Sequence, residues 1–298
     1  MNEIQYTYER KTLLEQFRIF CKVNKPENFE IAVEFFTVFG GLNREVNCSK
    51  DLKSQIEIHI LKRYKYLRND ISAISRGTKE AHKILSCLAL SDRRTNSTFK
   101  RCKISFDNGI EIIDDQCKLG MLKLEKSFQR FTNKEKNNNI SEKLIFTTPF
   151  AHFWFCFVSP IFKGVRDGNF EESLNSFENK KVELTAFVYE QLCHEMIKEI
   201  YKHDEVKQLG RYWDNTSDII NLLAKTKSGK IIAGSIKYTN NKIKKSELNK
   251  LKATCKDLGI NVDTYMIFSK KGFTSELKSM KSENLGLYSL RNLNLLVL

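Results

Sequence analysis

The segment from Thr216 to Tyr238, TSDIINLLAKTKSGKIIAGSIKY, most limits the folds open to this chain. Two apolar runs rich in Ile, Leu and Ala flank the turn sequence Lys-Ser-Gly-Lys. Short apolar runs that meet at a glycine-containing turn predict two antiparallel strands joined by a tight loop. We therefore expect a β-hairpin here, with Lys237 near the end of its second strand.

The length of the turn decides which side chains share a face of this hairpin. Side chains alternate between faces along a strand, so a shift of one residue in the register reverses the face of every side chain. A three-residue loop centred on Ser228 places Asn221 opposite Ser235, on the face that carries Lys237. A two-residue turn at the Ser-Gly pair instead brings Asp218 onto that face.

Four further segments accompany the hairpin in a fixed order. They are TTPFAHFWFCFVSP (Thr147 to Pro160), LTAFVYEQLC (Leu184 to Cys193), LGRYW (Leu209 to Trp213) and YMIFSKKGFTSEL (Tyr265 to Leu277). Together the five blocks resemble the C-terminal half of the archaeal-type P-loop ATPases, in which an ATPase module is followed by a winged helix and a nuclease-like domain. The resemblance covers residues 147–298, about half of the chain.

The resemblance implies a restriction-endonuclease-like mixed α/β domain with a hairpin of the PD-(D/E)-x-K type. In that motif an Asp on the first strand and a Glu-x-Lys on the second converge on a divalent cation. Matched residue by residue, Lys237 keeps the lysine and Glu190 keeps a helix glutamate, but Asn221 stands at the Asp position and Ser235 at the Glu position. This spacing favours the three-residue loop, which points Asn221 and Lys237 toward the helix of Glu190.

These departures bear on catalysis. Mg²⁺ prefers charged oxygen ligands in near-octahedral geometry, and metal-assisted phosphodiester hydrolysis depends on such an ion. The neutral amide of Asn221 and the hydroxyl of Ser235 remove two negative charges. We therefore expect a degenerate site without a metal or other cofactor. The alternative is an active Mg²⁺-dependent endonuclease that uses Glu190 and Asp218 as metal ligands together with Lys237.

The overall charge points to a polyanionic partner. The chain has 50 Lys and Arg against 36 Asp and Glu, a net charge of +14 that is spread over both halves. Such a charge favours nucleic acid without implying a sequence preference, although a lysine-rich composition alone is the competing interpretation. Lys242, Lys244 and Lys245 follow the second hairpin strand, where we expect a DNA backbone. A solvated helix face is the other interpretation of this cluster.

The N-terminal half divides into two expected regions. Residues 1–76 show helical spacing, for example in the stripe Phe29, Val33, Phe36 and Phe39 that ends before a Gly-Gly pair, and we interpret them as a helical lead-in. Residues 77–146 predict a winged helix, with helices at Glu80 to Leu90 and Asn108 to Leu119. The strand that starts after Gly120, the strand Leu144 to Phe146 and a polar tip between them, which holds Lys134 and Lys136, would form the wing.

The charges of this winged-helix region give opposing indications. Recognition helices read base edges with Arg, Lys, Asn or Gln. Here the expected third helix, from Asn108 to Leu119, instead carries Glu111, Asp114 and Asp115, which would repel phosphates. We therefore expect phosphate contacts without base reading, and keep protein–protein packing by the winged helix as an alternative. The expected phosphate contacts come from the basic residues of the preceding segment: Arg93, Arg94, Lys100, Arg101 and Lys103.

Several classes of protein are disfavoured. The eight cysteines form no C-x-x-C pair, which argues against a zinc ribbon and a thioredoxin motif. The adjacent Cys193 and His194 point about 100° apart on a helix, so packing explains them better than a catalytic dyad. No G-x-x-x-x-G-K-[ST] string occurs, so we expect no ATP. The most apolar stretch is too short to span a bilayer, and we expect no signal peptide, no membrane partner and a cytoplasmic location.

Taken together, the residues and the resemblance predict an α/β protein that binds nucleic acid, with DNA as the expected form, mainly through phosphates. The expected regions are residues 1–76, 77–146 and 147–298. Two other functions stay open: an active metal-dependent DNA endonuclease, and a protein-interaction or regulatory module.

Overall fold

The computed structural model describes residues 11–128, 140–215 and 217–297 of the chain. Its N-terminal part is helical, as the sequence predicts. The helices are α1 (Leu13–Asn24), α2 (Phe29–Phe39), α3 (Leu52–Ile56), the π-helical turn η1 (Glu57–Leu61) and α4 (Tyr64–Ile74).

Helix α2 has the bounds and the buried face that its residue spacing predicts. The side chain of Asn28 caps its first turn by accepting a hydrogen bond from a backbone N–H, at 3.0 Å. Gly40 follows its last residue. The stripe of Val33, Phe36 and Phe39 is buried in the main hydrophobic core. Three of the four residues of the expected stripe are therefore core residues, and Phe29 is half-buried.

Three helices and a two-stranded hairpin follow, in the order expected for residues 77–146. The strands pair antiparallel, with Leu122 opposite Phe146 and Glu125 opposite Lys143. The expected tip of the wing, with Lys134 and Lys136, lies outside the described residues. The elements are α5 (Lys79–Ala89), α6 (Thr95–Cys102), α7 (Phe106–Lys118), β1 (Leu122–Glu125) and β2 (Lys143–Phe146).

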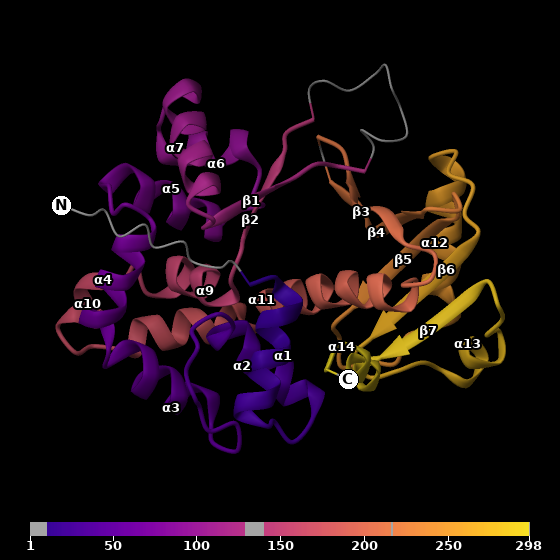
Figure 1. Ribbon diagram of the computed structural model, residues 1–298, viewed down its shortest axis with the longest axis horizontal. Helices are drawn as coiled ribbons and strands as arrows, with labels where there is room; N and C mark the ends of the chain where they lie inside the picture. The colour runs from indigo at the N-terminus through magenta and orange to yellow at the C-terminus, as the bar shows by residue number, and fades with distance from the viewer. Residues whose placement is uncertain (1–10, 129–139, 216, 298) are drawn as a thin grey trace.

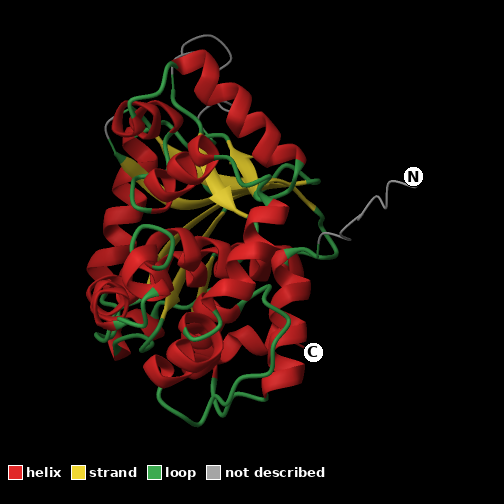
Figure 2. Ribbon diagram, turned by 90° about the vertical axis from the view of Figure 1, so that its left-hand side faces the viewer, coloured by secondary structure: helices red, strands yellow, loops and turns green. Residues whose placement is uncertain are grey.

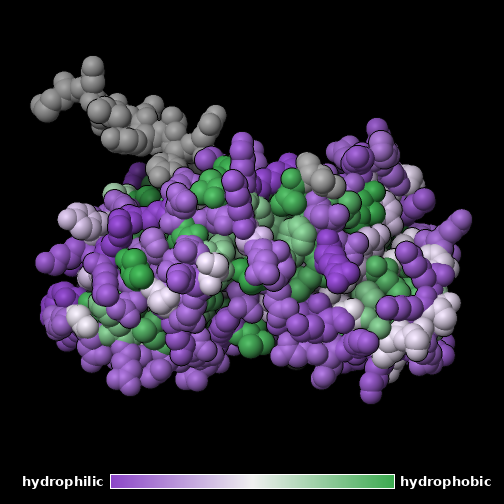
Figure 3. Space-filling view, turned by 90° about the horizontal axis from the view of Figure 1, so that it is seen from below, coloured by the Kyte–Doolittle hydropathy of each residue, from purple (hydrophilic) through white to green (hydrophobic). Residues whose placement is uncertain are grey.

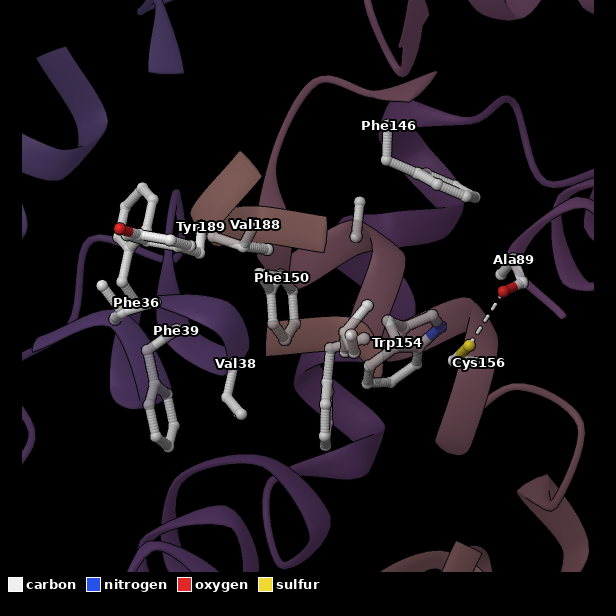
Figure 4. Packing of buried hydrophobic residues seen from close by; sticks show 14 of the residues in the cluster. Phe36, Val38, Phe39, Ala89, Phe146, Phe150, Trp154, Cys156, Val188 and Tyr189 are labelled. Carbon is white, nitrogen blue, oxygen red and sulfur yellow. Dashed lines mark hydrogen bonds between the residues drawn. The ribbon is translucent and has the colours of Figure 1, made fainter. Parts of the chain in front are cut away.

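A long helix links this region to the sheet that follows. Helix α11 (Glu171–Ile200) has 30 residues and runs across the molecule from the N-terminal helices to the sheet (Figure 1). The shorter α9 (Pro149–Phe157) and α10 (Phe162–Arg166) precede it. Figure 4 shows Phe150 and Trp154 of α9 among buried side chains from α2 and from α11.

The C-terminal part is built on a five-stranded mixed sheet with the strand order β3-β4-β5-β6-β7. The strands from β3 to β5 pair antiparallel, while β5, β6 and β7 pair parallel. A parallel pair needs a crossover connection, and α12 provides it between β5 and β6. The elements are β3 (Val206–Trp213), β4 (Asp218–Thr226), β5 (Ile231–Lys237), α12 (Lys245–Asp257), β6 (Thr264–Ser269), α13 (Ser275–Ser279), β7 (Leu285–Ser289), η2 (Leu290–Leu293) and α14 (Asn294–Val297).

The two faces of this sheet pack against different helices (Figure 2). Leu222 and Ile232 belong to the main core, together with residues of α11. The alternating residues Leu223 and Ala233 belong to a second cluster, together with Leu248 and other residues of α12. Helix α11 therefore covers one face and α12 covers the other.

The hairpin of β1 and β2 contacts the outer strand of the sheet. The backbone N–H of Phe128, just after β1, donates to the carbonyl of Arg211 at 2.7 Å. The hydroxyl of Ser127 donates to the carbonyl of Trp213 at 2.7 Å. The segment after β1 therefore covers part of the free edge of β3. Such a cover protects an edge strand from pairing with another chain.

One hydrophobic core connects the three expected regions. It contains Phe17 of α1, Leu85 of α5 and Leu296 of α14. The mixed α/β class, with helices first and a sheet-containing part after them, is as predicted. No helix among the described residues is long and apolar enough to cross a bilayer.

Candidate functional site

The register of β4 and β5 agrees with the three-residue loop. Leu222 pairs with Gly234, and Lys225 pairs with Ile231. The N–H of Thr226 donates to the carbonyl of Lys230 at 3.0 Å, which leaves three residues in the loop. Continued by one residue, this register places Asn221 opposite Ser235.

An irregularity in β4 changes the direction of Asn221. The pairing with β3 shifts register near this point. Ile220 lies in the cluster on the α12 side, whereas Leu222 lies in the core on the α11 side. The side-chain Nδ2 of Asn221 donates to Glu190 Oε2 at 3.0 Å, and the main-chain carbonyl oxygen of Asn221 is 2.9 Å from His194 Nε2. Asn221 therefore contacts α11.

Lys237 and Ser235 contact the other helix. Lys237 Nζ lies 3.2 Å from Glu247 Oε1, and the Ser235 hydroxyl donates to the same oxygen at 2.6 Å. Glu247 is in the first turn of α12. The expectation that Asn221 and Lys237 both point toward Glu190 is thus wrong, because the irregularity in β4 turns Asn221 to the opposite face from Lys237.

An arginine lies between the carboxylates of this region. Arg211 of β3 is 3 % exposed; its Nε pairs with Glu190, and its Nη1 is 3.1 Å from Glu125 Oε2. Glu190 comes from α11 and Glu125 from β1, so the guanidinium joins three elements. It also lies 4.9 Å from the centre of the Phe187 ring. Glu190 thus has a guanidinium and an amide as its partners.

Asp218, the other acidic candidate, also pairs with cations. The ammonium of Lys143, a buried residue of β2, pairs with its Oδ1, and Arg94 Nη2 lies 3.8 Å from the same oxygen. Arg94 Nη1 further donates to the carbonyl of Asp214 at 2.6 Å. Glu190 and Asp218 are held in separate ion pairs. Within the described ranges, no group of three or more His, Cys, Asp or Glu side chains is arranged to hold a metal.

Two of the arginines expected at a phosphate surface face inward. Arg94 is 8 % exposed in the contacts just described. Arg93 has its guanidinium 3.8 Å from the centre of the Phe187 ring. Arg93 adopts a left-handed backbone conformation, with a φ of 66°, in the turn before α6. This turn brings the two residues against α11 and the sheet, and their expected contact with nucleic-acid phosphates stays a prediction.

The remaining basic candidates lie at the surface. Lys242 and Lys244 are exposed, and Lys245 Nζ lies 3.4 Å from Glu276. On α6 and its C-terminal cap, Lys100, Arg101 and Lys103 are exposed, and the Arg101 guanidinium donates to the carbonyl of Leu90 at 3.1 Å. In the view of Figure 3, hydrophilic residues dominate the surface and hydrophobic residues form separate patches.

The third helix of the winged-helix-like region carries its charges outward. Asp107, Glu111, Asp114 and Asp115 line a shallow depression on α7. Phe106, at the start of the helix, is 58 % exposed beside them. This face combines negative charge with an exposed aromatic ring.

The sequence analysis missed four residues that complete the ion pairs. Arg211, Lys143 and Glu247 each supply a charge to a candidate residue on another element. Glu125 in turn pairs with Arg211. One signal was present, because Arg211 interrupts the otherwise uncharged block LGRYW in a strand. Lys143 and Glu125 have no such signal, since their positions depend on how the hairpin meets the sheet.

Comparison with known proteins gives one match. A family model, DUF234, described as archaeal and bacterial proteins of unknown function, matches residues 154–251. The matched segment runs from within α9 to the middle of α12 and includes Glu190, Arg211 and Glu247. No curated protein and no solved structure matches the chain. The match names neither a nuclease nor a winged-helix family and assigns no activity.

Proposed function

We propose that this protein binds nucleic acid, with DNA as the expected form, through its phosphates and does not cleave it. The observation that carries the proposal is the contrast between the two sets of charges around the hairpin. The residues at nuclease-motif positions are paired with other side chains, whereas Lys242 and Lys244, just beyond β5, are exposed.

The pairing of the acidic residues supports the absence of cleavage. For Mg²⁺ to bind Glu190, the ion would have to compete with the buried Arg211. Removing one partner from a buried ion pair costs about 3–5 kcal/mol, because the other charge stays buried and unpaired. Asn221 and Ser235 add no charge that would attract the ion. The element order α11-β3-β4-β5-α12-β6 is consistent with a nuclease-like core that has lost its metal chemistry.

The exposed lysines support binding to phosphates. Neither Lys242 nor Lys244 forms an ion pair with another described residue, and the net charge of the chain is +14. Lysine acts as a point charge toward phosphate and reads no bases. The acidic face of α7 disfavours base reading by that helix, so the proposed binding is independent of sequence.

A salt series tests this proposal. Fluorescence anisotropy with a labelled DNA duplex should give a logarithm of affinity that falls linearly with the logarithm of salt concentration, by about 0.9 per phosphate neutralised. Replacing Lys242, Lys244 and Lys245 by Ala should reduce this slope by up to about three of those units and weaken all sequences alike. As a control, alanine at the exposed Lys22, Lys25 and Lys50 of the N-terminal region should leave the slope nearly unchanged. Affinity that does not depend on salt would contradict the proposal.

The face of α7 favours a second candidate, an interaction module. Phe106 is an exposed aromatic anchor beside four carboxylates, which suits a basic partner protein. Under this alternative, Phe106→Ser would abolish partner binding, and the three lysine substitutions would not. If the Lys242, Lys244 and Lys245 alanine variant loses DNA binding and Phe106→Ser keeps it, nucleic-acid binding is the favoured function.

A further inference from the structure

A small cavity lies between the C-terminal end of α5, α9 and α11. Its volume is about 40 Å³, and its lining includes Arg93, Cys156, Lys180 and Phe187. Figure 4 shows two of the lining residues, Ala89 and Cys156, and the Cys156 thiol donates to the carbonyl of Ala89 at 3.0 Å. One water needs only about 10–15 Å³ of such space, so the cavity has room for a group of several atoms.

Arg93 brings a guanidinium without an ion pair among the described residues to this cavity. Its Nε is buried and has no hydrogen-bond partner, and no described residue forms an ion pair with its guanidinium. The neighbouring cations, in contrast, all form ion pairs. Arg94 and Lys143 pair with Asp218, and Arg211 pairs with Glu190. The carboxylates of Glu125, Glu190 and Asp218 act on Arg93 only from a distance. A buried N–H without a hydrogen-bond partner costs free energy, so this arrangement favours an anionic ligand in the cavity.

Arg93 remains charged under physiological conditions. Burial, followed by the nearby charge of Arg211, lowers the pKa of Arg93 to about 10. This value is still well above neutral pH. The Phe187 ring lies against the guanidinium at 3.8 Å and leaves the N–H groups on its edge for hydrogen bonding.

The other lining groups suit a small anion. Lys180 adds a second positive charge, which the exposed Glu183 at the same cavity offsets in part. His152 is neutral, because burial and then the charge of Arg93 lower its pKa to about 3. The Cys156 thiol already donates to a carbonyl. Arg93 and Lys180 are therefore the residues that can hold an anion here.

We propose that this cavity binds one phosphate group, with Arg93 as the principal ligand and Lys180 as the second. The guanidinium presents parallel N–H groups that match two phosphate oxygens, which distinguishes it from the point charge of a lysine. The volume admits the phosphate group and excludes a whole nucleotide. Free inorganic phosphate and the terminal phosphate of a nucleic acid share this chemistry. The proposal does not depend on the lysines that follow β5.

The first experiment titrates inorganic phosphate into the full chain by calorimetry, with chloride used to keep the ionic strength constant. The wild type should bind one equivalent saturably. Arg93→Gln should abolish the binding, and Arg93→Lys should raise the Kd at least tenfold because the charge stays and the fork is lost. The exposed Arg291→Gln should leave the Kd unchanged. Phosphate binding that is absent, or equal in wild type and Arg93→Gln, would overturn the proposal.

Two additions make the result decisive. If Arg93→Gln fails to fold, Lys180→Gln provides the test. This variant should raise the Kd for phosphate several-fold, and an unchanged Kd would overturn the proposal. A duplex with a 5′-phosphate should bind more tightly than the unphosphorylated duplex if the terminal group enters the cavity, and this difference should vanish with Arg93→Gln. Phosphate binding without that difference assigns the site to free phosphate. The Lys242, Lys244 and Lys245 alanine variant should keep the phosphate isotherm, which separates this site from the proposed DNA surface.

Discussion

At the scale of single residues, the main interaction of Glu190 is its ion pair with Arg211. The guanidinium contacts Glu190 and Glu125 in a buried position, so its charge is matched by carboxylates of two other elements. Such a network stabilises one arrangement of the sheet, α11 and the β1–β2 hairpin.

Replacing Arg211 tests its role directly. Arg211→Ala should lower the free energy of unfolding by about 3 kcal/mol, because the half-buried carboxylates of Glu190 and Glu125 would lose their partner. Lys62→Ala, which removes a surface pair with Glu57 at 2.8 Å, should cost no more than about 1 kcal/mol. Urea unfolding measures both variants. Equal effects of the two substitutions would show that the Arg211 network adds no stability.

Buried histidines give the stability a dependence on pH. Burial and then Arg211 lower the pKa of His194 to about 4, and His152 is lowered to about 3. The unfolded chain, with an ordinary histidine pKa near ~6.5, takes up protons first as the pH falls. The free energy of unfolding should therefore hold above about pH 6.5 and fall below it, by about 2 kcal/mol per histidine at pH 5.

The variant His194→Gln isolates one of these groups. The glutamine amide can still donate to the carbonyl of Asn221, but it does not titrate. Urea unfolding at pH 7 and pH 5 should show a smaller loss of stability in the variant than in the wild type. An identical loss in both would contradict the assignment of this pH dependence to His194.

At the scale of elements, the sequence predicted most helices and strands but not the direction of several side chains. The order of elements and the loop of β4 and β5 follow from local signals, namely caps, apolar periodicity and the Ser-Gly turn. The inward direction of Arg93 and Arg94 depends on a left-handed residue before α6 and on partners far away in sequence. Local patterns carry no information about such contacts.

The irregularity in β4 limits how far a metal site can be restored. Asp at position 221 would lie beside Glu190, whereas Glu at position 235 would lie beside Glu247, on the other face of the sheet. The double variant Asn221→Asp, Ser235→Glu should therefore show no Mg²⁺-dependent cleavage. Incubation with plasmid DNA and Mg²⁺ checks this result. Cleavage by the double variant would show that the two positions can reach a common metal.

At the scale of the whole molecule, the main core runs from α1 to α14 and joins the helical half to the sheet. Helix α11 packs in this core and also carries Glu190, which pairs with Arg211, and Phe187, whose ring lies against Arg93. The hairpin of β1 and β2 reaches the same region through Glu125 and Lys143. The candidate site therefore lies where the parts of the fold meet, which the sequence alone could not predict.

The most direct measurement combines binding and cleavage in one sample. Supercoiled plasmid is incubated with the wild-type protein in Mg²⁺ or Mn²⁺ at low salt, and one half is deproteinised before electrophoresis. We expect retarded plasmid in the untreated half and intact supercoiled plasmid in the deproteinised half. Nicked or linear plasmid, with cleavage that disappears in Lys237→Ala or Glu190→Ala, would contradict it, as would the absence of any retardation.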